Sequence, residues 1–168
     1  GIPVKDFVDK NAKKFIELCF RLNISNDDFI RTTQQRHTKV AKEIFKKVYK
    51  KGDIYKGFYE GLYCRGCEAF YTEKELINGK CPEHHTPLEY LKEESYFFRL
   101  SNYKDKIIKL IQEKNLIYPP QWKNEILSRL KNEDIKDLSV TRINKTWGIK
   151  TPIDNKHTMY VWFDALLN

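Results

Sequence analysis

The sequence predicts an α/β fold that carries a small zinc-binding knuckle, and three observations support this prediction. Apolar residues recur at helical spacing over the first 51 residues, whereas β-branched and aromatic residues dominate from residue 54 onward. Two cysteine-containing turns lie within that second stretch. The chain closes with an apolar, β-prone run and the opening of a helix, which is typical of the edge of a larger α/β domain. We therefore expect the chain to be one part of a longer protein.

The composition of the 168 residues is that of a folded, basic protein. Apolar residues make up 40% and aromatic residues 14%, so a packed core is expected. The net charge of +8 favours a polyanionic partner without requiring one. The sequence has no run of about 18 apolar residues and no signal pattern at its start, so we expect no membrane partner. Three of the four cysteines cluster near a histidine, which indicates a reducing compartment, the cytoplasm or an organelle.

Two short motifs, Cys64-Arg-Gly-Cys67 and Cys81-Pro-Glu-His84, predict one structural zinc site. Two residues separate the members of each pair, and thirteen separate the pairs. Two such turns facing each other form a tetrahedral site with three sulfur ligands and one nitrogen ligand, which suits Zn²⁺. Because four protein ligands leave no position for water, this zinc is expected to hold structure and do no chemistry.

The knuckle has one ambiguous ligand and one alternative interpretation. His85 competes with His84 for the fourth position, and we prefer His84 because it repeats the two-residue gap of the first pair. Disulfides are the alternative, but the remaining cysteine, Cys19, belongs to a helical pattern in which core packing is expected. The turn dipeptide Asn78-Gly79 can bring the second pair back to the first.

The first 51 residues predict two amphipathic helices. The first spans about 1–24, with Pro3 suited to its first turn, and is followed by a polar break and a short extended stretch over 29–33. The second spans about 34–51, and we expect a structural role for His37 near its start. The expected buried face of this second helix consists of Val40, Ala41, Ile44, Phe45 and Val48. Its exposed face is basic, and both a solvated surface and contact with an RNA backbone remain open.

The middle of the chain predicts strands and then two more helices. Strands are expected over 54–63, 88–91 and 95–100, where three adjacent aromatics either fill both faces of a strand or stack on bases. Ser101 is a candidate N-cap for one helix, and Pro120 can open the next. An extended segment over 137–142 and a buried strand over 158–163 complete the pattern, with a final helix opening at Asp164.

Five stretches, in order along the chain, carry a family likeness. They are Asp28-Phe-Ile-Arg-Thr-Thr33 with Arg36-His37, Gly52-Asp-Ile-Tyr-Lys-Gly57, Tyr63-Cys-Arg-Gly-Cys-Glu-Ala-Phe-Tyr71, Glu93-Glu-Ser-Tyr-Phe-Phe-Arg-Leu-Ser101 and Tyr160-Val-Trp-Phe-Asp-Ala-Leu-Leu-Asn168. Together they resemble methionyl-tRNA synthetases, which are class I aminoacyl-tRNA synthetases. The resemblance implies a segment of a Rossmann-like catalytic domain with an inserted α+β zinc-knuckle domain.

The resemblance also implies a domain division and a set of partners. Residues 1–52 would be helical elements at the end of the first half of the catalytic fold, 53–157 the inserted connective-peptide domain with its knuckle at 64–84, and 158–168 the start of the second half. The whole enzyme would use methionine, ATP with Mg²⁺, and tRNA(Met). This segment would need the remainder of the synthetase chain.

Three residues outside the knuckle acquire expected roles from the resemblance. Trp162 and Ala165 match positions that line the methionine side-chain pocket. Arg142 matches an arginine that assists adenylate formation, which suits a guanidinium because it can offset charge that develops on the α-phosphate. These residues supply the expected substrate and catalytic contacts of the segment.

The chain departs from the family pattern in two ways. Thr146-Trp-Gly-Ile-Lys150 stands where Asp-Trp-Gly-Ile-Pro is expected. Both ATP-binding signatures of the family, His-Ile-Gly-His and Lys-Met-Ser-Lys-Ser, are absent from these residues, so we expect the segment to be inactive alone. The alternative function is a free-standing zinc-ribbon module that binds RNA without catalysis, but such a module has no evident use for the motif at 161–165.

Overall fold

The structure is a computed structural model that describes residues 1–67, 69–143 and 145–167. It combines helices and strands in the order given by these bounds: α1 (Val4–Arg21), α2 (Gln35–Lys50), β1 (Ile54–Cys64), β2 (Ala69–Tyr71), β3 (Glu89–Phe98), α3 (Lys104–Glu113), α4 (Pro120–Asn132), β4 (Leu138–Ser139), β5 (Thr141–Ile143), β6 (His157–Met159) and α5 (Val161–Asp164). Short 3₁₀ helices occupy Glu73–Glu75, Leu100–Tyr103 and Ala165–Leu167. Helix and strand thus both contribute, as the sequence predicts.

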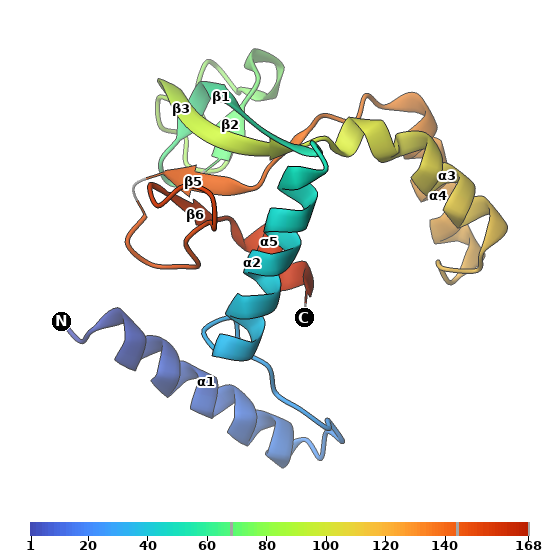
Figure 1. Cartoon of the computed structure of the whole chain (residues 1–168). Helices are drawn as coiled ribbons and strands as arrows, with labels where there is room; N and C mark the ends of the chain where they lie inside the picture. The colour runs from blue at the N-terminus through green and yellow to red at the C-terminus, as the bar shows by residue number, and fades with distance from the viewer. Residues whose placement is uncertain (68, 144, 168) are drawn as a thin grey trace.

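In Figure 1 one antiparallel sheet lies above α2, and a second, smaller one lies beside the upper half of that helix. The larger sheet has the strand order β2-β1-β3-β4, and the smaller one pairs β5 with β6. The long strands β1 and β3 pair over ten residues, from Ile54 opposite Phe98 to Tyr63 opposite Glu89. The two strands predicted separately over 88–91 and 95–100 therefore form one continuous strand, β3.

The core lies where α2 meets the two sheets. Phe45 of α2 is fully buried and makes edge-on contacts with Tyr96 of β3 and Phe163 of α5. The buried cluster consists of Ala41, Phe45, Ile54, Tyr96, Val140, Ile149 and Met159. Because its members come from α2, β1, β3, β6 and the loops beside them, this cluster fixes the helix against both sheets.

Two expectations for the N-terminal helices need correction. Helix α1 forms, but none of its residues is buried, and the apolar side chain of Phe20 is 87% exposed. In α2 the expected core residue Val40 is 43% exposed, whereas His37 is buried in its place. The helical period places Val40 about 100° from Ala41, at the margin of the buried face, and His37 one turn before Ala41 and directly on it.

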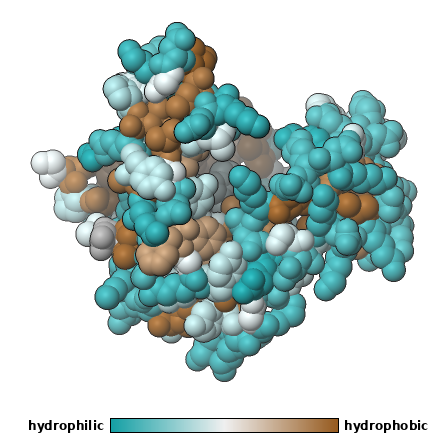
Figure 2. Space-filling view, turned by 90° about the horizontal axis from the view of Figure 1, so that it is seen from above, coloured by the Kyte–Doolittle hydropathy of each residue, from teal (hydrophilic) through white to brown (hydrophobic). Residues whose placement is uncertain are grey.

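The predicted helices over the second half form at Pro120 and after Ser101. Pro120 occupies the first turn of α4, as predicted. Ser101 is not the N-cap of α3, because its hydroxyl donates to Asp137 at 2.6 Å and the helix starts at Lys104. Helices α3 and α4 form a hairpin beside the sheet, and its surface is largely hydrophilic around an apolar strip (Figures 1 and 2).

The final strand is shorter than predicted. Strand β6 ends at Met159, and Val161 begins α5 instead of extending the strand. A short continuous apolar run occurs both in buried strands and in buried helices, so the sequence pattern alone does not separate the two. Asp164, where a helix was predicted to open, is instead the last residue of α5, and a 3₁₀ helix follows over Ala165–Leu167. Asn168 lies outside the described residues.

None of the helices in the described part of the chain has the length and apolar character that a bilayer span requires.

Substitution of the buried Phe45 tests the placement of this core. Phe45→Ala should lower the free energy of unfolding by about 3–5 kcal/mol, because it removes a fully buried aromatic ring and its contacts with Tyr96 and Phe163. Val40→Ala on the same helix is the matched control and should change stability by less than about 0.5 kcal/mol. Denaturant unfolding followed by circular dichroism measures both, and equal losses would contradict the placement of the core.

Candidate functional site

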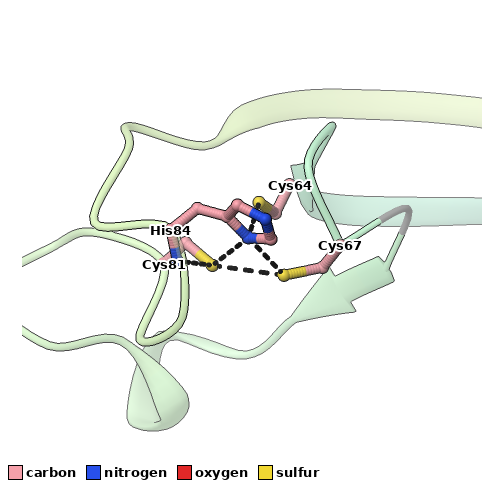
Figure 3. A group of neighbouring side chains, drawn as sticks. All are labelled: Cys64, Cys67, Cys81 and His84. Carbon is pink, nitrogen blue, oxygen red and sulfur yellow. Dashed lines mark hydrogen bonds between the residues drawn. The ribbon is translucent and has the colours of Figure 1, made fainter.

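The chain folds so that three cysteines and one histidine, all possible metal ligands, converge at one end of β1 (Figure 3). Cys64 is the last residue of β1, and Cys67 lies in the turn that leads to β2. Cys81 and His84 lie in a second turn. The positive backbone φ angles of Asn78 (53°) and Gly79 (73°) reverse the chain just before it. This reversal is the one that the Asn-Gly dipeptide predicts.

The four donor atoms have the spacing of a metal centre. The Sγ of Cys67 lies 3.0 Å from Nδ1 of His84 and 3.4 Å from the Sγ of Cys81. Nδ1 of His84 is 4.0 Å from the Sγ of Cys64 and 3.9 Å from the Sγ of Cys81. Tetrahedral coordination with metal–sulfur bonds near 2.3 Å and metal–nitrogen bonds near 2.1 Å gives donor separations of about 3.6–3.8 Å. The cluster can therefore hold one metal ion, and His84 rather than His85 is the histidine in it.

The thiols of the cluster differ in acidity. Burial raises the pKa of Cys81, but hydrogen bonds from His84 outweigh this effect, and the pKa lies at about 6. The pKa of Cys67 is about 12: Tyr71 lowers it, whereas burial and the sulfurs of Cys81 and Cys64 raise it. One sulfur therefore ionises readily while its neighbour resists ionisation. A divalent cation offsets the accumulated negative charge and allows all of them to act as ligands.

Gly66 is required by the close approach of the two turns. A Cβ atom at this position would lie 2.7 Å from the imidazole ring of His84, well inside van der Waals contact. Any larger residue would push His84 away from the three sulfurs. The glycine of the first Cys-x-x-Cys turn thus makes room for the fourth ligand.

Arg142 lies in β5 and is held firmly. Its Nη1 donates to the hydroxyl of Ser139 at 2.8 Å and to the carbonyl of Thr141 at 2.9 Å. The guanidinium carbon lies 3.7 Å from the centre of the Tyr160 ring, which is a cation–π contact. Arg142 lines a cavity of about 440 Å³, and Cys67 of the knuckle lines the same cavity.

The two residues expected to contact methionine lie just beyond β6. Trp162 occupies the single turn of α5 and is 57% exposed, and Ala165 follows at the start of a 3₁₀ helix. Trp162 is not among the residues that line the cavity beside Arg142. Tyr160 connects the two regions, since its ring stacks on Arg142 two residues before Trp162.

Two buried histidines near these residues were not expected to have charged neighbours. His37 of α2 is 2% exposed, and its Nε2 lies 3.6 Å from a carboxylate oxygen of Asp164 in α5. Burial raises the pKa of Asp164, and His37 partly opposes this rise. The sequence offers a signal for this pair only in hindsight: both residues lie in stretches of the family likeness.

The second histidine, His157, belongs to another group of possible metal ligands. It is fully buried, and its ring nitrogens lie 3.1 Å from Asp154 and 3.7 Å from Glu94. The ammonium of Lys56 already contacts Glu94 at 2.9 Å and lies 4.0 Å from Asp154. The ammonium of Lys56 therefore offsets part of the negative charge of the two carboxylates in this group.

Comparison with known proteins finds similarity over the whole chain. The family described as tRNA synthetases class I (M) matches residues 1–90 and 85–168. The methionine–tRNA ligase of Clostridium perfringens is 48% identical over 169 residues, and that of Clostridium tetani is 46% identical. Each alignment covers 100% of this chain and 26% of the relative, so the chain spans about a quarter of the length of these curated relatives.

Solved structures show the same similarity in three dimensions. Mycobacterium tuberculosis methionyl-tRNA synthetase in complex with methionyl-adenylate superposes with a TM-score of 0.85 at 37% identity. The match covers 99% of this chain and 33% of that one. The apo form of the same protein superposes with a TM-score of 0.80.

The knuckle geometry makes a prediction about metal content. Protein purified without chelator should contain one equivalent of a divalent transition metal, because four donors converge within bonding range of one point. His84→Ala should lose or strongly weaken metal binding, whereas the matched control His85→Ala should retain it. Elemental analysis of the three proteins is the measurement. Absence of metal from the unsubstituted protein, or its loss in His85→Ala alone, would overturn this ligand set.

Proposed function

This chain belongs to the class I tRNA synthetase family of the methionine type, and from that membership we propose that it forms the central segment of a methionine–tRNA ligase. The observation that carries the proposal is the 48% identity with such a ligase from end to end of this chain. The intact enzyme would activate methionine with ATP to methionyl-adenylate and then transfer the methionyl group to tRNA(Met). Mg²⁺ would accompany ATP, and the segment would act together with the rest of the synthetase.

We propose three parts within the segment. Residues 1–52 complete the first half of the catalytic fold, 53–157 form the inserted domain, and 158–168 begin the second half. The larger sheet supports this division, because β1 starts at Ile54 and carries the knuckle at its far end. The core around Phe45 would then join the inserted domain to the catalytic halves.

We propose that the metal of the knuckle is zinc, held by Cys64, Cys67, Cys81 and His84. Three thiolates and one imidazole form a donor set that zinc accepts with tetrahedral geometry. Four protein ligands complete its coordination, so the ion would supply structure and no open position for chemistry. Its role would be to fix the turn that contains His84 against the end of β1.

Arg142 would act on the chemical step. During adenylate formation the methionine carboxylate attacks the α-phosphate of ATP, and negative charge develops on the phosphate oxygens. A guanidinium held in place by Ser139 and Tyr160 can stabilise that charge without reorganising. Since the contact strengthens as charge develops, it would favour the transition state over the bound substrates.

Trp162 and Ala165 would recognise the methionine side chain. The indole of Trp162 is largely exposed in this segment, so one face is available for a ligand. A thioether packs well against an aromatic face, with a sulfur–aromatic contact of about 1 kcal/mol in addition to buried area. The small side chain of Ala165 would leave room beside it.

The alternative function, a free-standing zinc-ribbon module that binds RNA, is not favoured. The identity with methionine–tRNA ligases extends through the residues on both sides of the knuckle, including α1, α2 and α5. A ribbon module would explain the knuckle and the basic charge but not these flanking elements.

The proposed function itself is tested with the intact protein. It should catalyse exchange of pyrophosphate into ATP that depends on methionine, and it should charge tRNA(Met) with methionine. Other amino acids serve as controls for specificity. Exchange that does not depend on methionine, or no exchange in a protein shown to be folded, would contradict the proposal.

Trp162→Ala should raise the KM for methionine roughly tenfold or more while changing the KM for ATP little, because the lost contact is with the methionine side chain. Trp122→Ala is a matched control, since Trp122 lies on α4 and is 53% exposed against 57% for Trp162. Steady-state exchange kinetics in the intact protein measure both. An unchanged KM for methionine in Trp162→Ala would remove this residue from the pocket.

Arg142→Gln should lower the rate of adenylate formation by roughly 10²-fold with smaller effects on substrate binding, since its contribution grows as charge develops. Arg129→Gln on α4 removes the same charge from an exposed position and should react at the normal rate. Single-turnover adenylate formation separates the chemical step from binding. A normal rate in Arg142→Gln would show that this arginine has only a structural role.

A further inference from the structure

The outward face of α2 carries a line of lysines that the chemistry of methionine activation does not use. Lys39, Lys42, Lys46 and Lys50, here called the lysine stripe, are all exposed. Their spacing of three, four and four residues places them within an arc of about 80° on the helix, along about 16 Å of its length. The stripe is therefore a nearly straight row of positive charges.

The charges of the lysine stripe are not neutralised within the protein. None of its four ammonium groups makes an ion pair in residues 1–67, 69–143 and 145–167, whereas nearby Lys51 pairs with Asp53 at 2.6 Å. The sequence of α2 holds one carboxylate, Glu43, and it too lacks an ion pair in the described part of the chain. Burying four unpaired ammonium groups against protein would be strongly unfavourable, so this face requires water or a polyanion.

The buried face of α2 disfavours a lipid surface as the partner of this helix. His37, Ala41 and Phe45 are buried there, so the helix has no free apolar face to insert into a lipid surface. A partner on the exposed side meets mainly ammonium groups, with Glu43 as the one carboxylate of the helix. Lysine side chains act as flexible point charges that neutralise phosphates without reading sequence.

The lysine stripe continues into a hollow that suits nucleic acid. Lys42 lines this hollow of about 830 Å³, together with Lys150 and Trp147. Two carboxylates also line it: Asp9, which pairs with Lys5 and Arg31, and Asp164, which lies beside His37. The indole of Trp147 is 45% exposed. Positive groups along a groove with an exposed aromatic ring are the combination that binds a nucleic-acid backbone and stacks on an unpaired base.

We propose that the lysine stripe of α2 binds the phosphate backbone of tRNA; this inference rests on the proposed function, in which tRNA is a substrate. The stripe supplies affinity that does not depend on base sequence and orients the tRNA along α2. Trp147 and Lys150 extend the contact at the N-terminal half of the stripe.

The test compares two sets of four Lys→Gln substitutions in the intact protein. One set removes the lysine stripe, and the matched control removes the exposed Lys109, Lys114, Lys131 and Lys136 of the α3–α4 region. Removing the stripe should weaken tRNA binding at least tenfold near 0.1 M salt and reduce the slope of log Kd against log salt concentration by about three. The control should bind within about twofold of the unsubstituted protein.

Glu43→Gln should tighten binding roughly twofold, because it removes the carboxylate beside the stripe.

Equal losses in the stripe and control sets would overturn the proposal, since binding would then follow net charge alone. Normal tRNA binding by the stripe set would also overturn it, including a result in which that set loses affinity only for vesicles of anionic phospholipid. Methionine-dependent pyrophosphate exchange, which needs no tRNA, is measured in parallel. Its absence from the unsubstituted protein counts against the proposed function, whereas normal exchange with unchanged tRNA binding counts against the lysine stripe alone.

Discussion

The antiparallel pairing of β1 with β3 is the interaction on which the rest of the structure depends. Its ten residue pairs connect two sites that are far apart along the strand. At one end Ile54 and Tyr96 enter the core against Phe45, and at the other Cys64 presents the first thiol of the knuckle. Without this ladder the knuckle would have no fixed position relative to Arg142.

A buried group of hydroxyls connects the ladder to the smaller sheet. The Oγ of Ser95 lies 2.8 Å from that of Ser139, and the hydroxyl of Thr141 accepts a hydrogen bond from the backbone of Tyr96. Ser139 in turn accepts from Arg142. Burying a hydroxyl costs free energy unless it is hydrogen-bonded, so these hydrogen bonds favour one arrangement of the group. The guanidinium of Arg142 is held against this group by two hydrogen bonds, one to the hydroxyl of Ser139 and one to the carbonyl of Thr141.

The convergence of Cys64, Cys67, Cys81 and His84 was the most predictable feature, because their spacing limits where the four donor atoms can lie. Which residues of α2 are buried was less predictable, since Val40 and His37 both lie near the apolar arc and polarity favoured Val40. His37 is buried with Asp164, more than 120 residues later, beside its ring. Contacts between residues so distant in sequence have no local signal.

Periodicity also could not show whether an apolar face is buried by this chain. Helix α1 has the predicted period, yet its large side chains remain exposed. The position of Trp162 in a helical turn was hidden for a related reason: a short apolar run fits both a strand and a helix, and the contacts of Phe163 with Phe45 decide between them.

Because β1 is long, a small rotation of the strand about one end displaces its other end by several ångströms. From Ile54 to Cys64 the strand extends about 33 Å, at about 3.3 Å per residue. A tilt of about 5° at the end anchored near Phe45 would displace the knuckle by about 3 Å. Cys67 and Arg142 line one cavity, so that displacement would widen or narrow the space around the guanidinium. The packing around Phe45 would thus influence the width of a cavity whose lining extends to the knuckle at the far end of the strand.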